Sequence, residues 1–356
     1  MTLTLEQERA AEAIRHFITT DDFDKQTLVL HGLAGTGKTT VLTAIANEYP
    51  DAKLCAFTGK AASVLRAKSG LEACTVHGLF YKLVDKGSDE KTGKCILYFR
   101  RVHAENAMRG MVVLLDECSM IDAKTANDLI QSGAKIVAVG DPGQLPPVHG
   151  ATFFSHPDIS LTQIHRQALE SPIIRQALAV RDGGAYQPDT ADFQVVRNTS
   201  DEQMMAAGTI LCWRNVTRHK VNAKMRSLMG YNLPYPQAGE PVLCLKNAHR
   251  YGIFNGVTYE LARNFEPDDE SIHLLIDGVE VEVPKCVFVE QGGSLDDYDD
   301  DDFISVFDFG YCLTVHKSQG SEWDRVLLID ENHKHERRRW LYTAISRAAK
   351  SIIVQA

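Results

Sequence analysis

Short, mostly apolar runs alternate with helical patterns along the first 160 residues of the chain. Strands of this kind are typical of a parallel sheet that is covered by helices on both faces. The pattern therefore predicts an α/β domain in this part of the chain. Its predicted strands are Thr27–His31, Lys53–Phe57, Met111–Leu115 and Ile136–Val139.

The same alternation returns after residue 160, with a segment of different texture inside it. From residue 239 to about 289 the chain has short β runs, and Asn255-Gly256 and Asp277-Gly278 are typical hairpin turns. The sequence therefore predicts a small β-barrel inserted in a second α/β unit. Its aromatics Tyr251 and Phe254 could face a strand of nucleic acid, but core or turn packing is the favoured interpretation. The predicted barrel strands are Pro241–Leu245, Val257–Leu261, Ile272–Ile276 and Val279–Val283. The second unit has predicted strands at Thr209–Trp213, Asp308–Thr314, Val326–Asp330 and Ser351–Val354, and predicted helices at Val216–Leu228 and Arg338–Ser346.

Residues Lys82–His103 interrupt the first α/β pattern and predict a β-hairpin. A polar turn, Asp85–Lys94, precedes the strand Cys95–Arg101. Tyr98 and Phe99 stand beside two arginines, a composition that suits base stacking and phosphate contact. The same two rings are equally consistent with ordinary packing in a hairpin.

The composition narrows the classes of function. Of 356 residues, 44% are hydrophobic and 24% are charged, and no apolar run reaches about 18 residues, so a membrane span is not expected. There is no N-terminal signal pattern, and the eight cysteines include no C-x₂-C pair, so we expect a cytoplasmic protein with reduced thiols and no zinc site. The net charge of −9 does not indicate a basic nucleic-acid-binding domain. Six of the acidic residues lie in Leu295–Asp302, however, so a modest basic groove elsewhere is compatible with the composition.

The segment His31–Thr40 (HGLAGTGKTT) has the strongest chemical signal in the chain. It matches G-x-x-x-x-G-K-[ST] and lies between a predicted strand and a run of helix formers, as a phosphate-binding loop (P-loop) requires. Lys38 would supply a mobile charge to the phosphates, and Thr39 a hydroxyl ligand for Mg²⁺. Backbone N–H groups of the loop and the helix start are expected to surround the phosphates, at Gly35, Thr36, Gly37, Lys38, Thr39 and Thr40.

Gln7 precedes the phosphate loop and has two interpretations. With Thr4 it forms the pattern T-x-x-Q, which predicts a capping box at the start of a helix. A glutamine amide at this place is equally suited to pair with N6 and N7 of adenine. The two roles are compatible, and both are open at this point.

Acidic and polar residues follow the predicted strands at the edge of the sheet that carries the phosphate loop. Asp116-Glu117 comes directly after an apolar run, so we expect Asp116 in the Mg²⁺ shell and Glu117 as the base that orients and deprotonates water, rather than a surface acidic pair. The rigid loop Gly140–Pro147 would carry the Gln144 amide to the γ-phosphate. Arg166, taken alone, is more typical of a salt bridge.

Taken together, these motifs resemble those of the superfamily 1 helicases, most closely the RecD-like and Dda-like branch that moves 5′→3′. The matching segments span nearly the whole chain in the expected order: GLAGTGKTT (32–40), TGKAA (58–62), TVHG (75–78), LLDE (114–117), VGDPGQLPPV (139–148), HRQ (165–167), LTVHKSQGSEW (313–323) and LYTAISRA (341–348). The resemblance implies two RecA-like P-loop lobes with a β-hairpin insertion in the first and a small SH3-like β-barrel in the second. It places the first lobe at residues 1–160, the second at 161–238 and 306–356, and the barrel at 239–305.

The resemblance also implies roles for individual residues around ATP and DNA. Gln7 would read adenine, and Gln144 would sense the γ-phosphate. Arg166 and Arg347 would be arginine fingers that reach ATP from the second lobe. The residues that match DNA-gripping positions are Thr58, Lys60, His77, Thr314, His316 and Ser318, and Lys82–Arg101 occupies the place of the duplex-splitting pin.

We therefore expect an ATP- and Mg²⁺-dependent helicase that acts on single-stranded DNA and single-strand/duplex junctions, with replication or recombination proteins as candidate partners and no membrane association. The predicted hairpin is short and has no obvious wedge ring at its tip, which favours a second interpretation, an ATPase that displaces proteins from single strands without efficient unwinding. The third interpretation, a non-motor P-loop kinase, would have no use for two arginines of a second lobe. The long N-terminal domain of larger RecD-like proteins is absent from this sequence, so we expect a compact motor.

Overall fold

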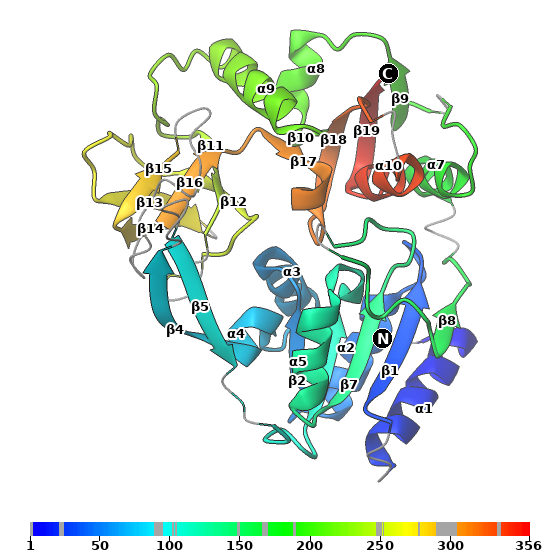
Figure 1. Cartoon of the computed structure of the whole chain (residues 1–356). Coiled ribbons are helices and arrows are strands. Elements are labelled where there is room, and N and C mark those ends of the chain that lie inside the picture. The colour runs from blue at the N-terminus through cyan, green and yellow to red at the C-terminus, as the bar shows by residue number, and fades with distance from the viewer. Residues whose placement is uncertain are drawn as a thin grey trace.

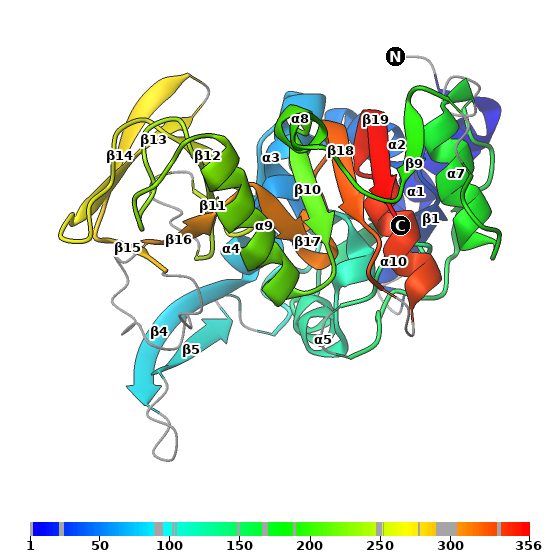
Figure 2. The same cartoon turned by 90° about the horizontal axis from the view of Figure 1, so that it is seen from above.

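The computed structural model shows two α/β units with a third sheet beside them (Figure 1). The described residues are 3–20, 25–88, 95–101, 103, 105–147, 150–165, 170–187, 190–246, 251, 253–276, 278–289, 305–332 and 336–356, with the backbone alone for 82–88 and 95–101. We call the unit with the P-loop lobe 1 and the other lobe 2. The lobes lie one above the other, and the third sheet lies to one side of lobe 2 (Figures 1 and 2). Among the described helices, none is long and apolar enough to cross a membrane.

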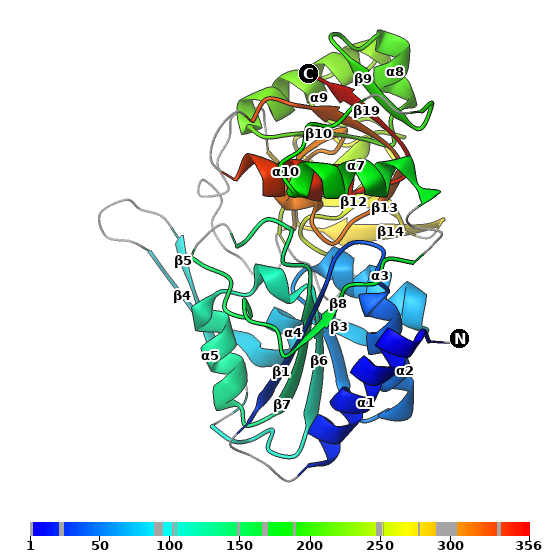
Figure 3. The same ribbon diagram turned by 90° about the vertical axis from the view of Figure 1, so that its right-hand side faces the viewer.

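Lobe 1 is built on a six-stranded sheet of order β3-β2-β6-β7-β1-β8, in which every pairing is parallel. The predicted α/β class with a parallel sheet is therefore confirmed. Helices cover both faces of the sheet (Figure 3), so its central strands are buried at almost every position. The strands are β1 (Thr27–Gly32), β2 (Lys53–Ala56), β3 (Ala73–Thr75), β6 (Val112–Asp116), β7 (Lys135–Gly140) and β8 (Ile159–Leu161). The helices are α1 (Leu5–Thr19), α2 (Lys38–Glu48), α3 (Gly59–Ser69), α4 (Val76–Phe80) and α5 (Ala123–Gln131), with a short 3₁₀ helix, η1 (Cys118–Met120).

Lobe 2 has a five-stranded parallel sheet of order β17-β10-β18-β19-β9. Helices α7 and α10 lie on the side of this sheet that faces lobe 1 (Figure 3). Trp340 and Tyr342 of α10 are fully buried there. The strands are β9 (Phe193–Val196), β10 (Thr209–Cys212), β17 (Cys312–Thr314), β18 (Trp323–Ile329) and β19 (Ala348–Gln355). The helices are α7 (Pro172–Arg181), α8 (Asp201–Ala206), α9 (Asn215–Leu228), η4 (Val315–Ser318) and α10 (Arg337–Ile345).

The third sheet has the order β14-β13-β12-β11-β16-β15 and is antiparallel except where β15 pairs with β16. The single strand predicted over Asp308–Thr314 is wrong, because the chain divides there into β16 of the third sheet and β17 of lobe 2. Gly310 lies at the crossing, where a Cβ atom would be 2.6 Å from Thr258 Cγ2 and 3.1 Å from Pro241 O. The third sheet thus extends past the expected boundary at residue 305. Its strands are β11 (Pro241–Cys244), β12 (Thr258–Leu261), β13 (Ser271–Ile276), β14 (Val279–Pro284), β15 (Cys286–Phe288) and β16 (Ser305–Phe309).

An antiparallel pair of strands, β4 (Tyr81–Ser88) and β5 (Cys95–Arg101), projects from lobe 1 (Figure 2). The turn predicted over Asp85–Lys94 begins too early, because the pairing continues to Ser88 opposite Cys95. Backbone hydrogen bonds can extend a two-stranded ribbon through polar residues. A hydropathy pattern therefore does not show where the paired strands end. Residues 89–94, between the two strands in the sequence, lie outside the described part.

A buried ion pair attaches the third sheet to lobe 2. Arg226 of α9 donates to Glu240, directly before β11, at 2.7 and 3.0 Å, and its guanidinium lies 4.0 Å from the centroid of the Phe309 ring. Glu240 is fully buried and also accepts from the Tyr311 hydroxyl at 3.1 Å. Both charges are therefore paired inside the protein, and the position of β11 against α9 depends on this cluster.

On another side the third sheet contacts lobe 1. The Phe254 side chain lies against Gly59 at the start of α3, where a Cβ atom on residue 59 would be 2.0 Å from Phe254 Cβ. The Arg66 guanidinium lies 5.9 Å from the centroid of the Phe254 ring. Tyr251 packs against the hydrophobic cluster of the third sheet itself. Both aromatic side chains are packing residues, as the sequence indicated.

We expect Arg226→Ala to lower the free energy of unfolding by about 3–5 kcal/mol, because Glu240 would stay buried without its cation. Lys350→Ala is a matched control, since the Lys350–Asp324 pair has side chains that are 72% and 62% exposed and should contribute about 0–1 kcal/mol. Urea unfolding of both variants and of the unsubstituted chain measures the two values. Equal, small losses in both variants would contradict the role given to the buried pair.

Candidate active site

The phosphate loop joins the end of β1 to the start of α2. Gly35 and Gly37 have φ angles of 80° and 78°, left-handed conformations that favour glycine. At Gly32 a Cβ atom would lie 2.4 Å from Thr36 Oγ1, so a larger residue would not fit without a shift of the loop. Lys38 begins the helix, and its Nζ donates to a carbonyl of the loop at 2.9 Å. The segment therefore has the strand, loop and helix that a phosphate site needs, with the first N–H groups of α2 available to a ligand.

Two carboxylates face this loop from the end of β6. Asp116 Oδ2 accepts from Thr39 Oγ1 at 3.3 Å, and Asp116 Oδ1 accepts from the Glu117 backbone N–H at 2.9 Å. Thr39 and Thr40 lie in the first turn of α2. β6 pairs with β7 and β7 pairs with β1, so the order of the parallel sheet itself produces this proximity. The hydroxyl and the carboxylate predicted to bind Mg²⁺ are adjacent.

Glu117 has a strained backbone in a charged environment. Its φ of 56° and ψ of 41° are left-handed, which is uncommon for a residue with a side chain and is frequent at functional sites. Burial raises the pKa of Asp116, and burial together with the Asp116 charge raises the pKa of Glu117. The charges of Arg347 and Lys38 lower the Glu117 pKa. The Glu117 carboxylate is thus influenced by a negative charge, that of Asp116, and by two positive charges, those of Lys38 and Arg347.

Gln144 lies in the loop that follows β7, and its side chain is 6% exposed. Among the described residues, no donor reaches its buried Oε1. A buried amide oxygen in this condition fits a ligand or an ordered water as its partner. The same loop is braced from within, because Asp141 Oδ1 accepts from the Gly143 N–H at 2.9 Å. The loop thus holds Gln144 with an amide oxygen, Oε1, that can accept a hydrogen bond from a ligand or a water.

Arg347 follows α10 in lobe 2 and is 7% exposed. Its guanidinium donates to two carbonyls and a hydroxyl of lobe 2, at 3.0 to 3.2 Å. Its charge nevertheless lowers the pKa of Glu117, so an arginine of lobe 2 acts electrostatically on a carboxylate of lobe 1. Arg166, the other predicted arginine finger, lies outside the described residues.

Backbone and core contacts join the lobes beside this site. The Leu145 N–H donates to Thr343 Oγ1, and Leu145 O accepts from Gln319 Nε2, both at 2.9 Å. The Leu145 side chain is 2% exposed and belongs to the hydrophobic cluster of lobe 2. The loop that carries Gln144 is therefore anchored in both lobes. Leu145, Thr343 and Gln319 had no assigned role in the sequence, because these contacts join segments far apart in the chain.

Gln7 connects α1 to the P-loop. The capping box predicted with Thr4 is present, with backbone-to-side-chain bonds of 3.0 and 3.3 Å in the two directions. Gln7 Nε2 also donates to Thr36 O at 3.1 Å and lies 2.7 Å from His165 Nε2, which must accept. Pairing with adenine would require Nε2 to leave one of these partners. The sequence did not indicate His165, since this contact joins residues 158 positions apart.

The segments predicted to grip DNA come from both lobes and meet at the seam. Thr58 is the N-cap of α3 and accepts from the Ala61 N–H at 3.1 Å. A Cβ atom on Gly320 of lobe 2 would lie 3.1 Å from Thr58 Oγ1 and 2.7 Å from Ala61 Cβ. Lys60 is half-buried in the first turn of the same helix. Movement of one lobe against the other would therefore change the spacing of these two segments.

The other DNA candidates differ in exposure. His77 is exposed on α4 and lies against two aromatic rings, with centroids 5.7 and 5.3 Å from its own. His316 is half-buried, and burial lowers its pKa, so the imidazole is neutral near pH 7. Thr314 is 8% exposed, and Ser318 is fully buried with its hydroxyl donating to a carbonyl of its own loop at 2.8 Å. Ser318 therefore shapes the loop, and its side chain is not positioned to touch DNA.

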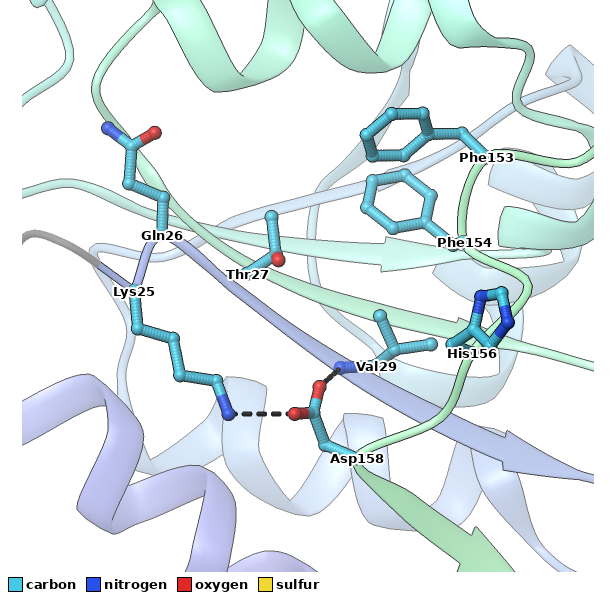
Figure 4. Close-up of a pocket in the computed structure, with 8 residues that line it drawn as sticks. All are labelled: Lys25, Gln26, Thr27, Val29, Phe153, Phe154, His156 and Asp158. Atoms are coloured by element: carbon cyan, nitrogen blue, oxygen red, sulfur yellow. Dashed lines mark hydrogen bonds and ion pairs between the residues drawn. The ribbon is translucent and has the colours of Figure 1, made fainter.

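A separate pocket of about 340 Å³ lies near the start of β1, whereas the P-loop follows the end of this strand (Figure 4). Lys25 and Asp158 in its lining form an ion pair at 2.7 Å, and Asp158 also accepts from the Val29 N–H at 2.8 Å. None of the predicted site residues lines this pocket. The candidate active site is therefore the P-loop edge of lobe 1 and the face of lobe 2 opposite it.

Comparisons with known proteins give two family matches and a long relative. Residues 2–201 match the AAA domain family, and residues 309–354 match the UvrD-like helicase C-terminal domain. The chain is 30% identical to the ATP-dependent RecD2 DNA helicase of Deinococcus radiodurans, in an alignment that covers 90% of this chain and 46% of that protein. The chain thus spans less than half the length of this curated relative.

Solved Pif1 helicase structures have a similar fold. A structure of DNA unwinding at forked duplex DNA by two coordinating Pif1 helicases gives a TM-score of 0.65 at 20% identity, covering 100% of this chain and 92% of that one. The Pif1 helicase from Bacteroides in complex with ADP-AlF3 and single-stranded DNA gives a TM-score of 0.62 at 20% identity, covering 100% and 93%. At these identities the likeness establishes the fold.

We expect Glu117→Gln to lower nucleoside triphosphate turnover by about 10²–10⁴-fold, the usual effect of losing a general base, while nucleotide binding persists. The amide is close in size to the carboxylate and accepts no proton. Glu72→Gln, exposed on lobe 1, is the matched control and should leave both unchanged. Phosphate release measures turnover, and a fluorescent nucleotide measures binding. Normal turnover in Glu117→Gln would exclude this residue as the base.

Proposed function

The chain belongs to the AAA domain family, and from this premise we propose that it is a RecD/Pif1-like superfamily 1B helicase that uses ATP to move 5′→3′ on single-stranded DNA. One observation carries the proposal. The loop after β7 in lobe 1 is bonded to α10 of lobe 2 through Leu145 and Thr343 at 2.9 Å, and Arg347 follows α10, so a nucleotide at this seam would be served by both lobes. Hydrolysis is then tied to the approach and separation of the lobes.

Each residue at the P-loop edge has a defined part in the reaction. Lys38 and the loop N–H groups bind the phosphates, and Glu117 orients the attacking water and takes its proton. The Gln144 amide contacts the terminal phosphate through its unsatisfied oxygen and a bridging water. Arg347 balances the charge of the transferred phosphoryl group, a contribution of about 10³–10⁵ in rate in phosphoryl transfer generally. Arg166 has the same role by resemblance.

Thr39 and Asp116 fit a Mg²⁺ ion. Both present oxygen atoms, 3.3 Å apart, beside the loop that holds the phosphates, and oxygen is the ligand atom that Mg²⁺ prefers. A bound ion would neutralise phosphate charge as a Lewis acid. At the other end of the nucleotide, Gln7 would read adenine after exchanging its contact with His165 for one with the base.

The DNA path in this proposal follows the seam between the lobes. Lys60, His77, Thr314 and His316 contact the strand from the two sides, while Thr58 and Ser318 hold their loops in shape. The contact between Gly320 and the start of α3 brings the two segments of this proposed path together. Alternate opening and closing at the nucleotide would change this spacing and advance the strand.

The two insertions have separate roles in the proposal. The β4–β5 hairpin acts as the pin at the single-strand/duplex junction, and the third sheet acts as the SH3-like domain of lobe 2. An isolated two-stranded ribbon is only marginally stable, so β4–β5 is a weak wedge unless DNA or a partner supports it. This observation favours a second candidate function, translocation on single-stranded DNA that displaces bound proteins with little unwinding. Replication or recombination proteins are the candidate partners in either case.

A pair of forked DNA substrates tests function and polarity together. We expect ATP-dependent unwinding of a fork with a 5′ single-stranded tail and none with a 3′ tail. Lys38→Ala should unwind neither, because the phosphates lose their mobile cation. Unwinding from the 3′ tail alone would refute the polarity. ATP-driven removal of streptavidin from a biotinylated single strand, without fork unwinding, would support the second function.

Titration of a labelled single strand tests the DNA path. We expect Lys60→Ala to weaken binding for all sequences alike and to lower the slope of log affinity against log salt by about 1, as loss of one phosphate contact does. Lys68→Ala removes an equal charge from the exposed end of the same helix and is the matched control. Fluorescence anisotropy at several salt concentrations gives both slopes. Identical slopes for the two variants would remove Lys60 from the path.

A further inference from the structure

A tyrosine of lobe 2 has its hydroxyl group inside the nucleotide site of lobe 1. Tyr342 lies on α10 and is fully buried. Its hydroxyl donates to Asp141 Oδ2 at 2.6 Å and accepts from the Ala34 N–H of the P-loop at 2.8 Å. The ring is closely seated, because a Cβ atom on Gly143 would lie 2.8 Å from Tyr342 Cε1. One hydroxyl therefore joins α10, the P-loop backbone and the loop after β7.

The acceptor of this hydrogen bond is shared with the P-loop lysine. Lys38 Nζ lies 3.8 Å from the same oxygen, Asp141 Oδ2, and Asp141 is 1% exposed. The other carboxylate oxygen accepts from the Gly143 N–H. Burial and the Asp141 charge raise the pKa of Tyr342, so the hydroxyl keeps its proton and remains a donor. The Lys38 ammonium and the Tyr342 hydroxyl thus both lie beside the same oxygen, Oδ2, of the buried Asp141 carboxylate.

Phosphate binding would change the balance at Asp141. Lys38 is the side chain that moves to the phosphates, and when it does, Asp141 loses the nearest cation that the structure places beside it. A hydrogen bond to a carboxylate is stronger when the carboxylate is less neutralised and its surroundings are dry. The bond from Tyr342 would therefore tighten when phosphate is present and relax when Lys38 returns.

We propose that Tyr342 is a positioning residue that reports phosphate occupancy of the P-loop to α10, and so holds Arg347, five residues further along the chain, against the nucleotide. The inference rests on the proposed function, because it assigns a task within ATP hydrolysis. A ring that merely filled the seam would need no hydroxyl, and one acceptor would satisfy a buried hydroxyl. Tyr342 instead bonds to the Asp141 carboxylate and to the Ala34 N–H, and bound phosphate would change the surroundings of both groups.

The test compares two tyrosines that make the same bond in different places. Tyr186 donates to Asp330 Oδ2 at 2.6 Å, wholly within lobe 2, so Tyr186→Phe removes an equal hydrogen bond away from the seam. With saturating single-stranded DNA, we expect Tyr342→Phe to lower kcat by about tenfold, with affinity for a fluorescent ATP analogue changed by less than about threefold. Tyr186→Phe should leave both unchanged. Asp141→Asn keeps the volume but not the charge, and should reproduce the loss in kcat even if Tyr342→Phe folds poorly.

A double variant and an exchange measurement separate signalling from packing. Tyr342→Phe combined with Asp141→Asn should turn over no more slowly than Asp141→Asn alone. Hydrogen exchange of the α10 amides should slow when a non-hydrolysable ATP analogue binds to the unsubstituted chain and to Tyr186→Phe, and should not change in Tyr342→Phe.

Three results would each overturn the inference. The first is a loss of kcat in the double variant that equals the combined losses of the single variants, and the second is the same kcat in Tyr342→Phe and Tyr186→Phe. The third is a slowing of exchange in Tyr342→Phe that matches that of the unsubstituted chain. The failure of the proposed function looks different, since the unsubstituted chain would then show no ATP hydrolysis stimulated by DNA. The exchange measurement needs no hydrolysis, so it still decides the role of Tyr342 in that case.

Discussion

The structure depends on an excess of negative charge gathered at one edge of the lobe-1 sheet. Asp116, Glu117 and Asp141 converge on Lys38, and a triphosphate would add more negative charge to the same place. Charges that are withdrawn from water must be balanced nearby, and the lobe-1 cations that act on these carboxylates are Lys38 and, at Asp116, Lys68. In the proposed reaction, the remaining balance would come from a divalent cation and from Arg347 of lobe 2. A nucleotide bound at this edge would therefore draw Arg347, and lobe 2 with it, toward lobe 1.

Much of the fold could be predicted because buried parallel strands leave a clear trace in the sequence. The runs that became β1, β6 and β7 are apolar at nearly every position, since helices cover both of their faces. Three-residue strands such as β3 and β8 are too short to leave such a trace. The division at Gly310 was missed because apolar residues precede and follow it, and the information lies in the space around one glycine.

The candidate site separates in the same way into local and distant parts. The P-loop and Asp116-Glu117 could be found because each is a short motif at the end of a strand. The bond from Tyr342 to Asp141 joins residues 201 positions apart, and that from Gln7 to His165 joins residues 158 apart, so neither has a signature along the chain. Burial adds what the motif containing Ser318 does not indicate, namely that the side chain of this residue points inward.

The close packing of Phe254 on Gly59 makes residue 59 a spacer between the third sheet and lobe 1. With a hydrogen atom in place of a methyl group, the aromatic ring lies directly on the backbone at the start of α3. The third sheet thus packs against lobe 1 at Phe254 and is attached to lobe 2 by the ion pair of Arg226 and Glu240, so it contacts both sides of the seam. A widening of the seam would separate the Phe254 ring from Gly59 and expose apolar surface to water. In the proposed motor, the third sheet would therefore oppose opening of the seam.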